Sequence, residues 1–350
     1  MFRQDRTNPS SAVSNWKGRK DTAKAWPSTA VSSWLNGGVF GGSGDAYNAY
    51  FVGGTNIADG YANTTGDKLG LISETISAIA VGLTQGVAWT SGMNNNGVAG
   101  YTGCGYHSGG SYSGSWKTAS KLVYASDTNS TLSDLPEAGY GVGSFTNSGV
   151  AGYVLGGSTS GTRRIGQKIV YLNDTSSSVA PSPSIFSTEG GVDSAYVGDG
   201  ASNSGTAGYY AGGIRSTQSA AVDKFIFSTE ARMTALSNEM TCDSYYTRAT
   251  EDQGTSCWFF PGNLCNTVVN KMPISNETSA AVSSGLSVGR NYMGVIGSKG
   301  VAVYAASVAY DADITTNTMD KWVTASDTRS TVTGVDRRNG PSTFANADWS

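Results

Sequence analysis

The sequence has few charged residues and almost no histidine. Asp, Glu, Lys and Arg make up 14% of the 350 residues, and the net charge is −3. An average soluble protein has about 25% of these residues. The small net charge excludes the basic field of a general nucleic-acid-binding protein. Because His107 is the only histidine, the commonest general base and metal ligand is nearly missing, and we expect neither an enzyme nor a bound cofactor or metal.

Long apolar runs are also missing. No stretch reaches the roughly 18 apolar residues of a membrane-spanning helix, and residues 1–20 lack the apolar core of a secretory signal. We therefore expect neither membrane insertion nor a leader peptide. The cysteines show no CxxC spacing and are too few for a disulfide scaffold, so we expect free thiols at Cys104, Cys242, Cys257 and Cys265.

Glycine, in contrast, is abundant. The chain has 47 glycines, about twice the usual share, and 10% of its residues are aromatic. Many glycines and few charges argue against a helical bundle, and low charge with many aromatic residues argues against disorder. The composition therefore indicates an all-β protein with many tight turns.

A unit of about fifty residues repeats six times. Its first mark is a lysine followed six residues later by an acid, with spacings of 53, 47, 56, 47 and 50 residues between the lysines. The pairs are Lys68 and Glu74, Lys121 and Asp127, Lys168 and Asp174, Lys224 and Glu230, Lys271 and Glu277, and Lys321 and Asp327. We expect each acid to lie in a turn, where such side chains bond their own backbone.

We expect each lysine to be the first residue of a strand and to cover an aromatic ring or pair with a nearby acid. The alternative is a ring of six cations around a central channel.

The second mark of the unit is an aromatic residue ahead of a glycine pair, as in Tyr50 before Gly53-Gly54. An x-Gly pair such as Asn96-Gly97 precedes five of these motifs, and such pairs between β-prone runs predict hairpins. Each unit therefore predicts four short antiparallel strands. Six units predict an all-β, six-bladed β-propeller. A solenoid of the same period would need capping units, and none is visible.

The ends of the repeat predict how the ring closes. The first clear unit lacks an inner strand, because it begins at its second strand with Tyr50. The C-terminal segment has the opposite defect: it resembles the inner strand of a unit, but no second strand follows it. We predict that a strand at about residues 342–347 lies beside Tyr50 and closes the ring. Residues 38–41 are the alternative occupant. The propeller would span residues 37–350, after an arm of residues 1–36.

The motif Asn-Ser-Gly-x-Ala-Gly-Tyr-x-x-Gly-Gly occurs at residues 147–157 and 203–213. With the acidic turn, it resembles a divergent kelch repeat, although the kelch tryptophan after that turn is missing. Over residues 45–347 the chain is more similar to kelch-like proteins of tailed phages of marine bacteria and cyanobacteria. This resemblance implies a virion structural protein, often of the tail. For such a protein we expect synthesis in the host cytoplasm and multiple symmetric copies.

Residues 1–36 differ from the repeat in composition. They contain six basic residues, two acidic residues and three tryptophans. Because Trp and Arg are favoured at the centres of protein interfaces, we expect an extended arm that docks into other virion proteins. Its anchors would be Trp16, Arg19, Lys20, Trp26 and Trp34. In the alternative, the tryptophans fold back onto the outer face of the propeller.

The sequence thus predicts a non-enzymatic virion component, of the tail or a tail fibre, that contacts host-surface glycan through Tyr106, Tyr112 and Trp116. The alternative is a secreted or cell-surface lectin, or a glycan-active enzyme, on a kelch propeller. The alternative fits less well because the acids recur in every unit, whereas a glycosidase needs one asymmetric pair.

Overall fold

The computed structural model describes most of the chain after residue 46. The chain divides into two units, Met1–Ala46 and Tyr47–Ser350, and every described residue belongs to the second. The described residues are 47–56, 62–79, 82–95, 97–107, 114–158, 165–179, 199–203, 205–213, 218–231, 234–244, 246–252, 254–262, 267–290, 293–298, 300–306, 318–334, 338–339 and 341–346.

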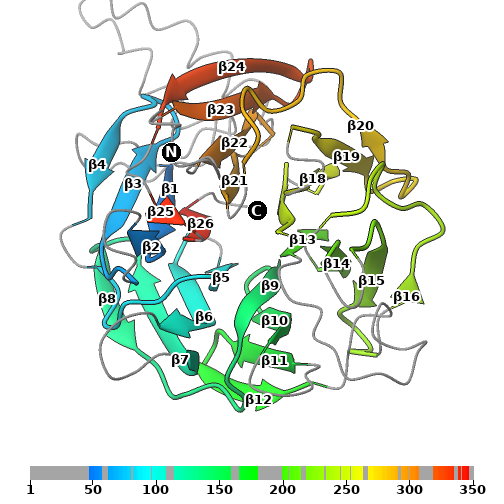
Figure 1. The fold of residues 1–350 in the computed structure, drawn as a ribbon. Coiled ribbons are helices and arrows are strands. Elements are labelled where there is room, and N and C mark those ends of the chain that lie inside the picture. The colour runs from blue at the N-terminus through cyan, green and yellow to red at the C-terminus, as the bar shows by residue number, and fades with distance from the viewer. Residues whose placement is uncertain are drawn as a thin grey trace, which may run out of the picture. The chain divides into compact units, whose positions relative to one another are not determined.

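This unit is a six-bladed β-propeller, as the sequence predicts. Its described strands form six four-stranded antiparallel sheets arranged around a central axis (Figure 1), together with one two-stranded sheet. The described residues include no helix long and apolar enough to cross a membrane.

The first three blades each have four strands, which follow one another from the axis outward. Blade 1 contains β26 (Ser342–Asn346), β1 (Asn48–Val52), β3 (Gly66–Gly70) and β4 (Ile76–Ala78). Blade 2 contains β5 (Ser91–Asn95), β6 (Ala99–His107), β7 (Gly114–Val123) and β8 (Thr128–Thr131). Blade 3 contains β9 (Tyr140–Asn147), β10 (Ala151–Ser158), β11 (Ile165–Val170) and β12 (Thr175–Ser178).

The other three blades have the same order from the axis outward. Blade 4 contains β13 (Asp199–Asn203), β14 (Ala207–Ala211), β15 (Val222–Ile226) and β16 (Thr234–Ala235). Blade 5 contains β17 (Arg248–Glu251), β18 (Ser256–Phe260), β19 (Asn270–Pro273) and β20 (Ala280–Ala281). Blade 6 contains β21 (Gly294–Ser298), β22 (Ala302–Ala306), β23 (Thr318–Val323) and β24 (Thr328–Thr333). The two-stranded sheet pairs β2 (Thr55–Asn56) with β25 (Arg338–Asn339).

The C-terminal strand closes the ring as the sequence predicts. β26 pairs with β1 so that Phe344 lies opposite Tyr50, and their rings stack with centroids 5.7 Å apart. Residues 38–41, the alternative occupant, lie outside the described residues. Phe344 also packs over Gly100 of blade 2, where a Cβ atom would overlap its ring. Blade 1 is therefore built from both ends of the propeller sequence.

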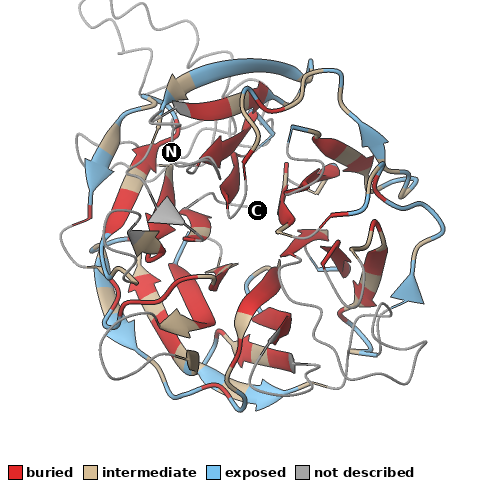
Figure 2. Ribbon diagram, viewed as in Figure 1, coloured by how far each residue is buried: buried red, intermediate tan, exposed pale blue. Residues whose placement is uncertain are grey.

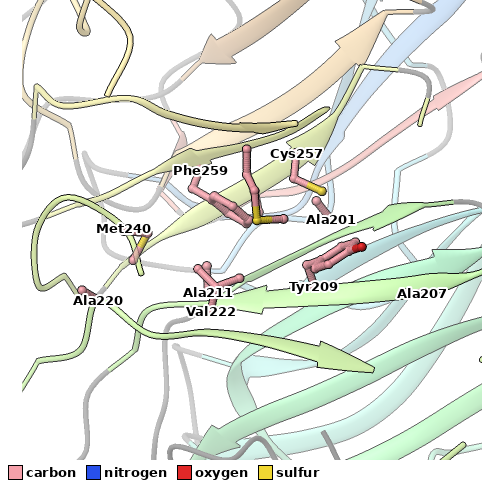
Figure 3. Packing of buried hydrophobic residues seen from close by; sticks show 11 residues of the cluster. Ala201, Ala207, Tyr209, Ala211, Ala220, Val222, Met240, Cys257 and Phe259 are labelled. Carbon is pink, nitrogen blue, oxygen red and sulfur yellow. The ribbon is translucent and has the colours of Figure 1, made fainter. Parts of the chain in front are cut away.

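Burial falls from the second strand to the rim of each blade (Figure 2). The second strands of blades 4, 5 and 6 are buried at every position, whereas β24 at the rim is almost wholly exposed. Side chains of neighbouring second strands pack face to face, as Tyr209 of blade 4 does with Cys257 and Phe259 of blade 5 (Figure 3). The hydrophobic core therefore lies mainly between blades.

The repeated lysines join neighbouring blades. Lys121 Nζ lies 2.8 Å from Asp174 Oδ2, and each lysine pairs with the turn acid of the following blade. The six pairs form a closed circuit: Lys68–Asp127, Lys121–Asp174, Lys168–Glu230, Lys224–Glu277, Lys271–Asp327 and Lys321–Glu74. The predicted pairing with an acid is confirmed.

One detail of the lysine prediction is wrong. Lys68 is the third residue of β3 and not its first, because strand pairing begins two residues earlier, at Gly66 opposite Val52. The alternative, a ring of six cations around the central channel, is excluded, since the lysines lie on the third strand from the axis.

In five blades a tyrosine on the second strand also bonds to the acid of this ion pair. Tyr101 OH donates to Asp174 Oδ1 at 2.8 Å, and Lys121 Nζ lies 5.4 Å from the centre of the same ring. Burial and the hydrogen bond to Asp174 raise the pKa of Tyr101, so its phenol stays a donor. In blade 5 the aromatic residue is Trp258, whose indole N–H donates to Asp252 Oδ2 at 3.0 Å instead.

The turn acids adopt a backbone conformation that most residues avoid. All six have φ between 46° and 56°, in the left-handed region. Their place in the turn is as predicted, but the predicted bond to their own backbone is wrong. The preceding residue makes that bond, as when Asn173 Oδ1 accepts the Thr175 N–H at 3.3 Å. This leaves the carboxylate of Asp174 directed to the neighbouring blade.

Substitution of Asp174 should separate these two roles. Asp174→Asn keeps a residue that tolerates the left-handed region but loses the charge, so we expect a stability loss of about 1 kcal/mol. Asp174→Ala loses both and should cost about 2 kcal/mol. Urea unfolding of both variants measures the difference. If the two variants unfolded at the same urea concentration, the left-handed backbone conformation at residue 174 would contribute nothing to the difference in stability.

A buried polar residue precedes each lysine, and in blades 3, 5 and 6 it holds the loop that enters the blade. Gln167 Oε1 accepts the Glu137 N–H at 2.8 Å, and Asn270 Oδ1 accepts the Thr241 N–H at 3.1 Å. Glu137 lies between β8 and β9, and Thr241 lies between β16 and β17. The six residues are Asp67, Ser120, Gln167, Asp223, Asn270 and Asp320.

Candidate binding site on the second blade

The β6–β7 hairpin departs from the repeat. β6 has 9 residues and β7 has 10, whereas β14 and β15 of blade 4 have 5 each. A bulge lies between Gly103 and Gly105, where Cys104 has φ of 60° at the position that blades 1, 3 and 4 give to glycine. Bulges bend a strand and redirect its side chains. Beyond the bulge, the hairpin continues to His107 opposite Gly114.

One face of the hairpin carries a cluster of three aromatic rings, which we call the Trp89 cluster. The rings of Trp89 and Tyr106 stack with centroids 5.0 Å apart and an interplanar angle of 26°. Tyr140 meets Tyr106 edge-on at 5.3 Å and lies 5.9 Å from Trp89. All three residues are half-buried. The cluster therefore presents aromatic surface at the junction of blades 2 and 3.

The other face carries the pair His107 and Trp116, with ring centroids 5.2 Å apart. Trp116 lies opposite Gly105 and His107 lies opposite Gly114, and because side chains alternate along strands, both point away from the face of Tyr106. The structure thus separates Tyr106 and Trp116, which we expected to act together. Tyr112 lies outside the described residues. His107 ends β6.

Backbone hydrogen bonds hold the rings in place. Ala88 and Tyr106 exchange N–H to carbonyl bonds of 2.9 and 2.7 Å, and the Gly141 N–H donates to the Trp89 carbonyl at 2.8 Å. Trp89 has φ of 52°, which is costly for a bulky residue. Strain of this kind persists where the surroundings fix it and is frequent at functional sites.

The tyrosine, tryptophan and histidine side chains of this surface combine apolar ring faces with polar O–H and N–H groups. Such a surface suits ligands that have both an apolar face and hydroxyl groups. Among the described residues, no group of three or more His, Cys, Asp or Glu side chains could hold a metal ion. The chemistry offered by this surface is therefore stacking and hydrogen bonding.

The sequence predicts only part of this site. It does not single out Trp89 and Tyr140, although neither falls on the aromatic position of the repeat, and that departure is a usable signal. The anchors expected in the arm, Trp16, Arg19, Lys20, Trp26 and Trp34, lie outside the described residues, so their role stays a prediction.

The cysteines divide into two classes. Cys104 and Cys257 are free and buried, as expected, and burial raises the pKa of Cys104 to about 12. Cys242 is disulfide-bonded, so the prediction of a free thiol is wrong there. Spacing along the chain does not report which cysteines meet once the blades are folded. Cys265 lies outside the described residues.

Among known proteins, no family model matches this chain and no curated protein does.

Proposed function

We propose that this chain is a non-enzymatic structural protein of a phage virion, a kelch-like propeller of the tail or a tail fibre. It attaches to other virion proteins through its N-terminal arm, is present in symmetric copies, and contacts host-surface glycan through the β6–β7 hairpin. The observation that carries the contact is the long β6–β7 hairpin with aromatic rings on both faces.

The opposite end of the propeller supports an assembly role. The first-to-second and third-to-fourth strand turns share this end, since the Tyr171 N–H bonds to the Val150 carbonyl at 3.0 Å. The exposed large apolar residues among those described lie at these turns, in the consecutive blades 6, 1, 2 and 3. They are Ile72, Val98, Val150, Leu172, Val301 and Val323. Apolar surface of this kind favours contact with another protein.

The virion role is tested on purified particles. Mass spectrometry and cryo-electron microscopy should find the chain in stoichiometric, symmetric copies. Deletion of residues 1–36 should prevent incorporation of the chain, because it removes the proposed anchors. A soluble monomer that cleaves polysaccharide would instead support the lectin or glycan-active enzyme.

The glycan contact is tested by substitution at the hairpin. Trp116→Ala removes a stacking ring, and binding to an array of bacterial surface glycans should weaken about tenfold, equivalent to about 1.4 kcal/mol. Leu172→Ala is the control, because Leu172 is 92% exposed in the turn after β11 of blade 3. If both Trp116→Ala and Tyr106→Ala bound glycan as well as the unchanged protein, the hairpin would not be the contact.

A further inference from the structure

The blades differ from one another at one end of the propeller, which we call the turn end. Here the turn between the last two strands of a blade lies beside the turn between its first two strands. The Tyr124 N–H bonds to the Val98 carbonyl at 3.1 Å, and the Phe227 N–H bonds to the Thr206 carbonyl at 3.1 Å. Each of these two kinds of turn has one exposed position at which the blades can be compared.

The outer position is the fourth residue after the repeated lysine. It is apolar in blades 6, 1, 2 and 3 and a serine in blades 4 and 5, and all six residues are exposed. In order from blade 1 they are Ile72, Ala125, Leu172, Ser228, Ser275 and Ala325.

The inner position follows the glycine of the x-Gly turn and divides the blades in the same way. Val98, Val150 and Val301 of blades 2, 3 and 6 are 54–60% exposed, whereas blades 4 and 5 have Thr206 and Thr255. Blade 1 has no such turn, because its first two strands come from opposite ends of the propeller sequence. Apolar residues that change together over four consecutive blades indicate a covered surface, which we call the apolar sector.

The charged turns of the apolar sector are balanced within each chain. Asp174 pairs with Lys121 and also accepts the Tyr101 hydroxyl at 2.8 Å. The other acids of the sector pair with lysines of the preceding blades in the same way: Glu74, Asp127 and Asp327. A partner therefore needs no opposite charge at these turns. A second copy of this chain meets that condition, because its own turns are balanced as well.

The apolar sector is large enough to hold two copies together. Neighbouring strands lie about 4.8 Å apart, so a blade of four strands extends about 20 Å from the axis to its outermost side chains. Four of six such blades present about 800 Å² at the turn end. Each partner of a typical stable protein–protein interface buries about that area.

The order of the blades makes the apolar sector self-complementary. Blades 1 to 6 follow one another around the axis (Figure 1), and the line between blades 1 and 2 divides the sector into equal halves. In two copies that face each other with a two-fold axis on this line, blade 1 meets blade 2, blade 3 meets blade 6, and blade 4 meets blade 5. Apolar positions then face apolar positions, and hydroxyl residues face hydroxyl residues.

We propose that two copies of this chain pair in this way, as an isologous dimer held by the apolar sector. The inference rests on the symmetric copies of the proposed function and names the contact between them. It leaves the β6–β7 hairpins at the two outer ends of the dimer, because this hairpin joins the second and third strands of blade 2 at the end opposite the turns. Both glycan contacts therefore stay accessible.

The first test is sedimentation equilibrium of the full chain, which should show a dimer with a dissociation constant in the micromolar range or below. Each dimer buries Leu172 twice, so Leu172→Ser should weaken pairing at least about tenfold. Ser228→Ala, at the same position in blade 4, is the control and should pair normally. Both side chains are exposed in a single chain, so neither change should disturb folding.

A charge exchange tests the two-fold axis, because blade 3 should meet blade 6. Val150→Glu and Val301→Lys should each prevent pairing, since both would bury an unpaired charge twice per dimer. An equal mixture of these two variants should form a mixed dimer, in which one contact becomes an ion pair and the other stays apolar. A mixture that stays monomeric would overturn the proposed axis.

Two further results would overturn the proposal itself. One is an unchanged protein that stays monomeric at about 100 µM, well above a micromolar dissociation constant. The other is a dimer that Leu172→Ser leaves at full strength, because another surface or the N-terminal arm would then join the copies. Purified particles separate this inference from the virion role: a monomeric chain present in stoichiometric copies on virions overturns the pairing alone.

Discussion

A chain that ends at Asn339 should lose the cooperative unfolding transition of the propeller. The truncation removes β26, whose five residues pair with β1 from Asn48 to Val52. It also removes Phe344, which is 2% exposed and packs on Tyr50 and on Tyr124 of blade 2. Loss of a buried Phe side chain alone costs about 3–5 kcal/mol, against a total stability of about 5–15 kcal/mol for a typical protein.

The closing strand also contacts the next blade, so the damage should extend beyond blade 1. Ser342 Oγ donates to the Ser91 carbonyl of β5 at 3.0 Å. A chain ending at Asn346 keeps every paired residue of β26 and serves as the control. Unfolding is followed by circular dichroism and tryptophan fluorescence. If the two truncated chains unfolded at the same midpoint, ring closure by β26 would contribute nothing measurable. The stability of the Phe344→Ala variant should lie between those of the two truncated chains, with a loss of about 3–5 kcal/mol.

The architecture could be predicted because its causes recur in every unit. Each lysine, turn acid and x-Gly pair stands at a similar spacing in the sequence. The glycines of the x-Gly turns, such as Gly97 with φ of 63°, have the left-handed conformation that this turn requires. Repetition also reveals what is missing. Because the first unit has no inner strand of its own, the sequence predicts that the C-terminal segment supplies it.

The identity of each partner could not be predicted in the same way. The sequence shows Lys121 with Asp127 six residues later, but Lys121 pairs with Asp174 of the following blade. The spacing of residues within one repeat indicates which residues lie near each other in one blade. The pair of Lys121 with Asp174 depends instead on the angle between two neighbouring blades. The small cavity on the axis was hidden for the same reason, because it forms only when six inner strands meet. The Trp89 cluster lies off the repeated positions altogether.

Replacement of Asp320 by Asn should be strongly destabilising, although the shape of the side chain hardly changes. Asp320 is fully buried, and its Oδ2 accepts the Ser287 N–H at 3.1 Å, the Ser287 hydroxyl at 2.9 Å and Arg290 Nη2 at 3.3 Å. Burial lowers the pKa of Arg290, and the charge of Asp320 acts against that shift. Removing one partner of a buried ion pair leaves the other charge uncompensated, so we expect a loss of about 3–5 kcal/mol.

The repeat provides a built-in comparison for this variant. Blade 5 has Asn270 at the corresponding position, where its Oδ1 accepts both the N–H and the hydroxyl of Thr241. An asparagine can therefore hold the entering loop, and the cost at Asp320 should come from the charge of Arg290. The double variant Asp320→Asn with Arg290→Met should recover part of the lost stability in urea unfolding. Asp134→Asn, in an ion pair with both side chains more than half exposed, should change stability by less than about 1 kcal/mol. A double variant no more stable than Asp320→Asn alone would place the cost in the loop contact and not in the buried charge.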